Sequence, residues 1–270
     1  MPKMSKITNL AYLKNNQYQN AANLDAQLSL HYRFSTNPHG WFPWVFDSLE
    51  RLPRQARVLE LGCGPAYMWS TCAQRISPEW SITLSDLSDD MCLAAWRNLV
   101  ITGRAFKYEQ IDAQSIPYPD ETFDIVIANH VLHHVPDQLK ALQEIRRVLK
   151  PRGHLVAATN GEKHLEELHT WVKQISLGKN YQPLRIAFTL ENGRKQLSPL
   201  FMDIEIHRYE DNLRITEIEP LIAYIRSSLN TELSETELEN LHQSLEIKLR
   251  SNPVLTVTKD AGLFLAIRQD

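Results

Sequence analysis

An acidic residue lies at or near the carboxyl end of each of three apolar, β-rich runs of the sequence. Two glycines follow the first run. Residues 58–66 read VLELGCGPA, so Glu60 lies at the end of that run, and Gly62 and Gly64 stand one residue apart. Glycines at a strand-to-helix turn permit positive φ, and they also remove the Cβ atoms that would hold a ligand away from the backbone. The pattern alone fits a purely structural turn as well as a ligand-binding loop.

The residues around these glycines indicate which ligand would fit. A dinucleotide fingerprint requires a third glycine at position 67, where this sequence has Tyr67. The carboxylate of Glu60 would repel a phosphate but suits an amine or a sulfonium cation. The sequence therefore favours a nucleoside that carries a positive charge and no phosphate.

Acidic residues also end the second and third runs. Asp86 follows the strand-like stretch 81–85, and Asp112 follows 106–111. A carboxylate has two acceptor oxygens and a ribose cis-diol has two donors, so the pairing is bidentate. Each acid alone is also explained as a turn residue, with Ser88 or Asp89 as a helix N-cap. Three acids in series are much harder to explain by chance.

These motifs together resemble the class I S-adenosylmethionine-dependent methyltransferases. Residues 60–64 match the family's first motif, E/D-x-G-x-G, with Ala66 where many members have a third glycine, and residues 86–91 match the second motif, D-L-S-x-x-M. The resemblance covers residues 58–159 and implies S-adenosyl-L-methionine as the cofactor. It implies that Asp86 binds the ribose, Met91 lies near the adenine, Asp112 and Ala113 bind the adenine, and Asn129 and His130 flank the methionine part. The cofactor-binding residues predicted in this core are Glu60, Gly62, Cys63, Gly64, Asp86, Leu87, Met91, Asp112, Ala113, Asn129 and His130.

Three histidines lie within five residues in the segment 123–137, FDIVIANHVLHHVPD. His130 and His134 would share a helix face, as zinc-binding pairs do, but no third ligand is apparent, so no metal is assigned. Backbone capping is the simplest alternative. Histidine also serves as a general base near neutral pH. Several small-molecule relatives carry a functional histidine after the leucine here, which favours His133 as the catalytic residue, with His134 as the second choice.

The first fifty residues are rich in aromatic side chains. N-terminal helices of this superfamily often cover the cofactor, so Arg33 is expected to pair with the cofactor's carboxylate, and Tyr32 and Trp41 are expected to line an acceptor pocket. Packing of amphipathic helices on the sheet edge is the alternative, and it is favoured for Trp44 and Phe46.

The order of the predicted elements indicates an α/β fold. Five β-rich runs alternate with helix-like segments, which predicts a Rossmann-like, seven-stranded, mostly parallel sheet with helices on both faces and an N-terminal helical lid. The last run, VLTVTKDAGLFLAIRQ, predicts an antiparallel hairpin around its Lys-Asp-Ala-Gly stretch. The strands are expected at 57–61, 81–85, 106–111, 123–128, 154–159 and 202–209, and the helices at 68–76, 89–101, 138–149, 162–175, 217–229 and 234–250.

Four regions follow from this organisation. Residues 1–48 are expected to form the helical cap and 49–160 the cofactor-binding core. Residues 161–255 are expected to form an insertion of helices and a strand that contributes to the acceptor site, and 256–270 the hairpin that completes the sheet.

Composition narrows the function further. A net charge of -3 gives no electrostatic case for a nucleic-acid or membrane partner, and three irregularly spaced cysteines indicate free thiols in a reducing, cytoplasmic setting. We therefore expect in-line methyl transfer to O, N or C of a small organic acceptor by a monomer or homodimer. An NAD-dependent oxidoreductase, a non-catalytic nucleoside-binding module, and an RNA or protein methyltransferase are the alternatives.

Overall fold

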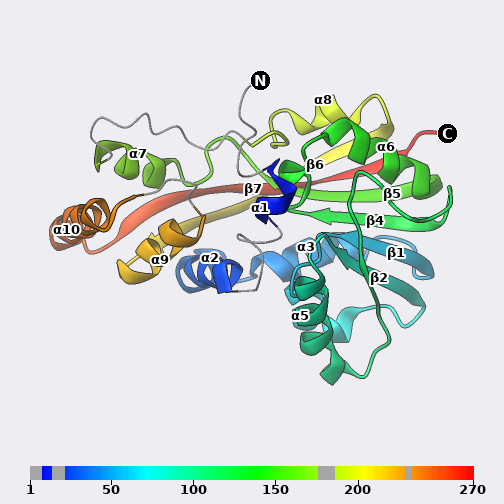
Figure 1. Ribbon diagram of the computed structural model, residues 1–270, viewed down its shortest axis with the longest axis horizontal. Coiled ribbons are helices and arrows are strands. Elements are labelled where there is room, and N and C mark those ends of the chain that lie inside the picture. Colours follow the sequence, from blue (N-terminus) through cyan, green and yellow to red (C-terminus); the bar gives the residue numbers. More distant parts are fainter. Residues whose placement is uncertain (1–7, 14–21, 176–185, 229–232) are drawn as a thin grey trace.

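The computed structural model describes residues 8–13, 22–175, 186–228 and 233–270, which contain one seven-stranded sheet (Figure 1). The strand order is β3-β2-β1-β4-β5-β7-β6. The strands are β1 (Ala56–Leu61), β2 (Trp80–Asp86), β3 (Lys107–Gln110), β4 (Phe123–Asn129), β5 (Leu149–Asn160), β6 (Phe201–Ile215) and β7 (Leu255–Arg268).

Strands β1 to β5 are parallel to one another, and β7 runs antiparallel to both β5 and β6. Parallel neighbours require crossover connections, and helices supply most of them. The order reverses at β1, with β2 on one side and β4 on the other, so the carboxyl ends of β1 and β4 adjoin. The Rossmann-like fold class predicted from the sequence is confirmed.

Helices cover both faces of this sheet (Figure 1). Those predicted at 68–76 and 89–101 are shorter than expected, because each ends in a 3₁₀ turn, Ala73–Arg75 or Val100–Thr102. The helices are α1 (Leu10–Tyr12), α2 (Ala22–Phe34), α3 (Trp41–Leu49), α4 (Tyr67–Thr71), α5 (Asp89–Leu99), α6 (Gln138–Val148), α7 (Glu166–Ile175), α8 (Gly193–Leu197), α9 (Glu219–Ser228) and α10 (Glu235–Ser251).

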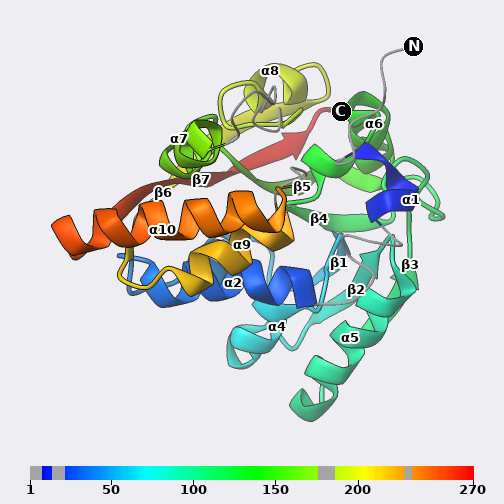
Figure 2. The same cartoon turned by 60° about the vertical axis from the view of Figure 1, so that its left-hand side comes forward.

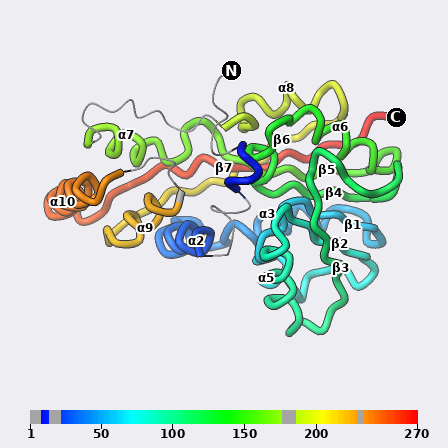
Figure 3. Tube along the Cα trace, viewed as in Figure 1, coloured from blue at the N-terminus to red at the C-terminus, as the bar shows by residue number. Residues whose placement is uncertain are grey.

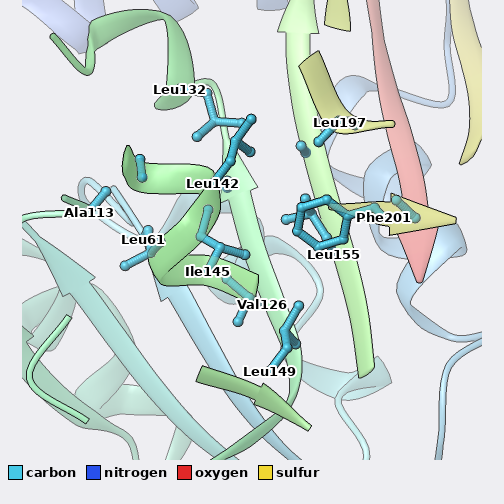
Figure 4. Close-up of a cluster of buried hydrophobic side chains, with 14 of the residues drawn as sticks. Leu61, Ala113, Val126, Leu132, Leu142, Ile145, Leu149, Leu155, Leu197 and Phe201 are labelled. Carbon is cyan, nitrogen blue, oxygen red and sulfur yellow. The ribbon is translucent and has the colours of Figure 1, made fainter. Parts of the chain in front are cut away.

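One face of the sheet packs against α6. Leu142 and Ile145 from this helix meet Val126 of β4 and Leu155 of β5 (Figure 4). All four side chains are almost completely buried, as expected for the apolar stripe of an amphipathic helix.

The opposite face packs against α3, α4 and α5. Its largest buried ring is that of Trp69 in α4, which forms edge-on contacts with Phe46 of α3 and Trp80 of β2. Packing was favoured for Phe46 from the sequence, and the structure confirms it, because this side chain is fully buried.

Strands β6 and β7 continue past the end of β5. Their pairing extends to Ile215 and Leu255, whereas β5 stops pairing with β7 at Asn160. Helices α2, α7, α9 and α10 surround this extension, and we call the assembly the helical lobe (Figures 1 and 2). In the Cα trace, α2 lies beside α9, nearly two hundred residues later in the chain (Figure 3). The lobe has its own buried cluster and adjoins the carboxyl ends of β4 and β5.

The predicted hairpin at the C-terminus is wrong. Residues 255–268 form one continuous strand, and Lys259 and Asp260 lie inside it, paired with Asp211 and Glu210 of β6. The Lys-Asp-Ala-Gly stretch has residue types typical of a turn. Its Gly262 instead allows the backbone of β6 to pack closely against β7. A Cβ there would lie 2.3 Å from the carbonyl oxygen of His207. The antiparallel partner is β6, which the sequence placed only at 202–209.

The boundaries of the four predicted regions stay predictions. The structure does show what some of these regions contain. The segment 161–255 supplies β6 to the common sheet, so it is more than an appended insertion. Parts of the predicted cap, residues 1–7 and 14–21, lie outside the described residues, as does Leu229 at the end of the predicted helix 217–229.

In the described ranges, no helix combines the length and the apolar character that a membrane crossing requires.

Truncation of Leu241 to alanine is predicted to destabilise the helical lobe. This side chain is fully buried between α10 and its neighbours, so its loss should lower the free energy of unfolding by about 2–5 kcal/mol. Ile247 lies on the same helix and is 64% exposed, so Ile247→Ala should cost less than about 1 kcal/mol. Chemical denaturation of both variants measures the difference, and equal losses would contradict the packing described.

Candidate functional site

The glycine loop after β1 holds three residues with left-handed backbone. Gly62, Gly64 and Ala66 have φ of 69°, 51° and 59°. A Cβ on Gly62 would lie 2.7 Å from Cγ2 of Val131, so this glycine is required for packing as well as for conformation. At Gly64 the nearest atom is Cδ2 of Leu24, at 3.5 Å. Val131 covers the backbone of Gly62. A ligand can therefore approach the backbone of Gly64 instead, if the side chain of Leu24 moves aside.

Helix α2 covers this loop. Besides the contact of Leu24 with Gly64, the hydroxyl of Tyr67 at the start of α4 donates a hydrogen bond to Asp25 of α2. The N-terminal lid expected from the sequence is thus present over the glycine loop.

Asp86 joins the end of β2 to the glycine loop. Its Oδ2 accepts a hydrogen bond from the Gly64 N–H at 3.0 Å, and its Oδ1 accepts one from the Ser88 N–H at 2.9 Å. Burial raises the pKa of this carboxyl, although the backbone donors oppose the shift. The Leu87 backbone also hydrogen-bonds to this carboxylate, so of its roughly four acceptor positions one is left for a ligand hydroxyl.

Leu87 and Met91 follow Asp86 along the chain. The Leu87 carbonyl accepts a hydrogen bond from the Gln110 side chain at 2.7 Å, and Met91 is buried. The Ser88 hydroxyl makes no cap hydrogen bond to α5. Backbone bonding to Asp86 holds this turn instead.

Glu60 lies below the loop, inside the core. Its carboxylate accepts a hydrogen bond from the indole N–H of Trp69, and burial raises its pKa to about 8, with the charge of Asp86 adding to the shift. Glu60 is therefore largely neutral at pH 7. The electrostatic argument that Glu60 would repel a phosphate is weaker than the sequence suggested, because burial neutralises the group.

Cys63 stands between the two glycines. Its N–H donates to the Ser85 carbonyl at 2.8 Å, which holds the loop against β2. A side-chain hydrogen bond with Cys92 and burial raise the pKa of the Cys63 thiol, so it stays protonated.

Asp112 and Ala113 lie at the same edge of the sheet, after β3. The backbone N–H of Ile111 donates to the Asp86 carbonyl at 3.0 Å, which links the ends of β2 and β3. The Asp112 carboxylate accepts a hydrogen bond from the Gln114 N–H at 2.9 Å, and Ala113 is buried. Asp86 and Asp112 therefore follow neighbouring strands at one edge, as predicted, with Glu60 beneath them.

Asn129 and His130 end β4 on the other side of β1. His130 has a φ of 56°, and its backbone N–H donates to the Ala158 carbonyl at 3.0 Å. A positive φ is costly for a residue with a large side chain, and it directs the ring toward Trp41, with ring centroids 5.1 Å apart. The Asn129 Oδ1 is buried and has no hydrogen-bond partner.

Five histidines meet near this strand end, and we call them the histidine cluster: His31, His130, His133, His134 and His164. Ring centroids are 5.7 Å apart for His31 and His164, 6.0 Å for His130 and His133, and 4.2 Å for His133 and His134. In the described part of the chain, no three histidine, cysteine or acidic side chains are arranged to hold a metal ion.

Four imidazoles of the histidine cluster, those of His31, His130, His133 and His164, are held neutral. Burial is the main cause. It lowers the pKa of His31 to about 3 and that of His130 to about 4. Burial also places the pKa of His133 and of His164 well below the usual value, and the neighbouring histidines add to the shift. Neutral imidazoles have one donor and one acceptor nitrogen each.

Tyr32, expected in the acceptor site, and Arg33, expected at the cofactor's carboxylate, lie elsewhere. Tyr32 is 93% exposed, and Arg33 forms an ion pair with Glu217 in which Nη2 lies 2.7 Å from both carboxylate oxygens. The inward face of α2 carries Leu30 and Phe34 instead, with His31 beside them. The prediction for Tyr32 is wrong because the helix phase was misjudged by one residue. The proposed pairing of Arg33 with a cofactor carboxylate would require Glu217 to be displaced.

Trp41 does lie beside the histidine cluster. Its ring is 5.1 Å from that of His130, 5.3 Å from Trp44 and 5.3 Å from Tyr209. Trp44 belongs to the same aromatic group, since it contacts Tyr209 at 5.1 Å.

Sequence reasoning missed His31, His164, Tyr209 and Lys259. None belongs to a motif, and each comes from a different element. Their convergence depends on the helical lobe, which no local pattern reveals.

Comparisons with known proteins agree with this geometry. Residues 59–157 match the model of a family described as a methyltransferase domain. The chain is 30% identical over 161 residues to the ubiquinone/menaquinone biosynthesis C-methyltransferase UbiE of Pasteurella multocida, covering 58% of this chain and 59% of that protein. It is 34% identical over 119 residues to a demethylmenaquinone methyltransferase of Listeria monocytogenes, covering 43% and 50%. The chain thus spans about half the length of the curated relatives it matches.

Solved structures share the fold at low identity. Phosphoethanolamine N-methyltransferase 2 of Haemonchus contortus, in complex with phosphomonomethylethanolamine and S-adenosylhomocysteine, has a TM-score of 0.58 and 21% identity, covering 100% of this chain and 62% of that one. The YcgJ protein of Bacillus subtilis also has a TM-score of 0.58, with 19% identity, covering 84% and 97%.

Glu60→Gln is predicted to stabilise the protein above pH 5. The unfolded carboxyl ionises near its ordinary pKa of 4.5, whereas the folded one keeps its proton up to about pH 8. Between these values the native state binds more protons, so stability is lost as the pH rises. The variant should melt at the wild-type temperature at pH 4 and roughly 3–10 °C higher at pH 8.

The matched control for this change is Glu79→Gln, because Glu79 is exposed. Thermal unfolding between pH 4 and pH 8 measures both variants. A Glu60→Gln curve parallel to that of the wild type would contradict the buried, neutral carboxyl.

Proposed function

We propose, from the premise that residues 59–157 belong to the class I S-adenosylmethionine-dependent methyltransferases, that this chain transfers a methyl group from S-adenosyl-L-methionine to a small organic molecule. The observation that carries the proposal is the position of Asp86 at the end of β2, where its carboxylate is hydrogen-bonded to the backbone of Gly64 and Ser88 beside the glycine loop. That arrangement suits a ribose lying against the Gly64 backbone once the Leu24 side chain moves aside.

The residues at the sheet edge fit this cofactor. Asp86 would accept hydrogen bonds from the ribose hydroxyls, and Asp112 and the Ala113 N–H would bind the adenine. The unpartnered Oδ1 of Asn129, at the switch point between β1 and β4, would accept a hydrogen bond from the ammonium group. Met91 and Leu87 would border the adenosine, and Leu24 would close over it.

When bound, the cofactor supplies an electrophilic methyl group on a sulfonium, open to in-line displacement with a neutral thioether as the leaving group. The chain's own contribution is mainly to align the acceptor and exclude water. His133 lies next to the strand end that carries Asn129, buried and with a free Nδ1, so we propose it as the group that takes a proton from the acceptor. His134 lies beside it as the second candidate.

The acceptor is proposed to be a small molecule rather than a nucleic acid. A formal net charge of -3 and 43% apolar residues are typical of proteins that do not rely on a polyanionic partner. The relatives named above methylate quinone precursors, according to their names, which agrees with a small organic acceptor. We further propose action in the cytoplasm, as a monomer or homodimer, because three free cysteines favour a reducing compartment.

Calorimetric titration with S-adenosylhomocysteine tests the proposal. We expect one site per chain with micromolar affinity or better, about -8 kcal/mol. NAD should not compete, since Tyr67 replaces the glycine that a dinucleotide requires. Tight binding of NAD without binding of S-adenosylhomocysteine would overturn the proposal in favour of an oxidoreductase.

Asp86→Asn should weaken S-adenosylhomocysteine at least about tenfold, because the amide loses one acceptor oxygen and the charge that strengthens the hydroxyl bonds. Asp90→Asn is the control, since Asp90 is exposed in the first turn of α5 nearby and leaves the loop untouched. Calorimetry on both variants gives the ratio. Equal affinities would show that Asp86 only holds the Gly64 turn.

A further inference from the structure

Buried polar atoms without partners converge on the junction between the core and the helical lobe. They are Oδ1 of Asn129 and the Nδ1 atoms of His31, His133 and His164. A buried polar atom that makes no hydrogen bond costs about 1–3 kcal/mol. Four such atoms at one junction, drawn from α2, β4 and the segments after β4 and before α7, indicate a site that a bound molecule completes.

The histidines at this junction face one another across the two parts of the fold. His31 and His164 form one ring pair in the lobe, and His130 and His133 form another at the end of β4. His130 contributes to the lowered pKa of His31, and His164 to that of His133, so the two pairs lie within electrostatic range of each other.

Aromatic rings border the junction on two sides. Trp41 lies against His130, Tyr209 lies edge-on to Trp41, and Tyr224 lies edge-on to His31 at 5.7 Å. Flat walls of this kind favour a flat or unsaturated molecule.

The electrostatic character of the junction is positive or neutral. The buried ammonium of Lys259 lies 4.9 Å from the centre of the Tyr209 ring, and its charge lowers the pKa of His31, His130 and His164. An ammonium ion placed among these groups would meet a cation and several buried imidazoles.

The carboxylates beside Lys259 already have cationic partners. Asp260, which also accepts a hydrogen bond from the Lys163 N–H, pairs with Arg208 at 2.5 Å. Asp211 pairs with Lys259 at 2.7 Å, and both side chains are buried. Its oxygens also accept from the Ser35 hydroxyl at 2.6 Å, the Thr36 N–H at 2.8 Å and the Asn37 N–H at 3.0 Å. Further donors from Thr36 and Asn212 leave this carboxylate saturated.

A surface groove leads to this ion pair from outside. It has a volume of about 530 Å³, and its lining includes Lys163, Tyr209 and Lys259 together with the acidic residues Glu210, Asp211 and Asp260. Lys163 precedes His164, and Tyr209 contacts Trp41, so the groove adjoins the histidine cluster.

We infer that the histidine cluster is the acceptor site, and that the acceptor carries a hydroxyl on an unsaturated carbon, as in a phenol or enol, rather than an alkylamine. This rests on the proposed function. His31 and His164 bind and orient the hydroxyl-bearing end, and Trp41 and Tyr209 border the unsaturated part. His31 and His164 lie outside the proposed cofactor site. They therefore act on the acceptor alone, as the residues that select its hydroxyl group.

The reaction balances in this site. The acceptor's O–H proton passes to an imidazole nitrogen, an oxygen lone pair forms the new bond to the methyl carbon, and the carbon–sulfur bond breaks with its electron pair on sulfur. The product is a neutral ether, and the imidazolium later releases its proton to water. Transfer to a conjugated carbon releases the same single proton. An alkylamine instead enters as an ammonium ion beside Lys259, where Asp211 and Asp260 already pair with other cations, and it must lose a proton before it can attack.

Matched acceptor probes test the inference. Hydroquinone and 1-naphthol serve as hydroxyl probes, and benzylamine and 1-naphthylmethylamine as amine counterparts of similar shape. Transfer of label from methyl-labelled S-adenosylmethionine is measured for each probe. We expect label on the hydroxyl probes at a rate at least about tenfold above the amines. Preferential labelling of the amines would overturn the inference.

Variants then assign the site. His31→Asn and His164→Asn should each lower hydroxyl-probe turnover at least about tenfold, while S-adenosylhomocysteine affinity by calorimetry stays within about twofold of wild type. His207→Asn is the matched control, because His207 pairs with Glu205 on β6, outside the cluster. Retained cofactor affinity shows that a variant is folded, and wild-type turnover in both would overturn the inference.

A binding measurement separates this inference from the proposed function. Imidazole ¹⁵N resonances of His31 and His164 should shift on addition of 1-naphthol, with or without S-adenosylhomocysteine, whereas that of His207 should not. Failure of S-adenosylhomocysteine to bind would contradict the proposed function alone. Binding of S-adenosylhomocysteine without any shift of the cluster resonances by the hydroxyl probes would overturn the acceptor site alone.

Discussion

The arrangement of the acceptor side depends on one buried ion pair. Asp211 of β6 and Lys259 of β7 are enclosed by the segment that joins α2 to α3, whose residues 35–37 donate hydrogen bonds to the carboxylate. Removing one partner of such a pair typically costs about 3–5 kcal/mol, because the other charge stays buried. This carboxylate therefore holds α2 on the sheet, and α2 in turn carries Leu24 over the glycine loop and His31 into the histidine cluster.

A second constraint sets the cofactor side. Parallel strands bring their carboxyl ends to one edge, so residues 62–64, Asp86 and Asp112 meet there although fifty residues separate the first from the last. The two sides adjoin at the end of β4, where the buried Oδ1 of Asn129 has no partner and His130 and His133 form a ring pair. Methyl donor and methyl acceptor would thus meet over a single strand end, enclosed by α2, which suits a reaction that depends on alignment and exclusion of water.

The sequence predicted what local patterns determine and missed what tertiary packing determines. Strand-to-glycine and strand-to-acid junctions are short, so the sequence correctly placed Gly64 in the turn after β1 and Asp86 at the end of β2. Helix α2 mixes apolar and polar residues without a clear stripe, so Tyr32 was chosen although its neighbour His31 faces inward. The stretch around Gly262 has turn chemistry, yet β6, far away in the sequence, extends it as a strand. Burial of Glu60 by Trp69 likewise changes its charge state in a way that residue types alone do not reveal.

The most direct test of the account is a crystal structure with S-adenosylhomocysteine bound. We expect the ribose hydroxyls on Asp86, the adenosine against the Gly64 backbone, and the sulfur directed past Asn129 toward the histidine cluster. Adenosine bound away from this edge, or a sulfur separated from the histidines by packed protein, would contradict it.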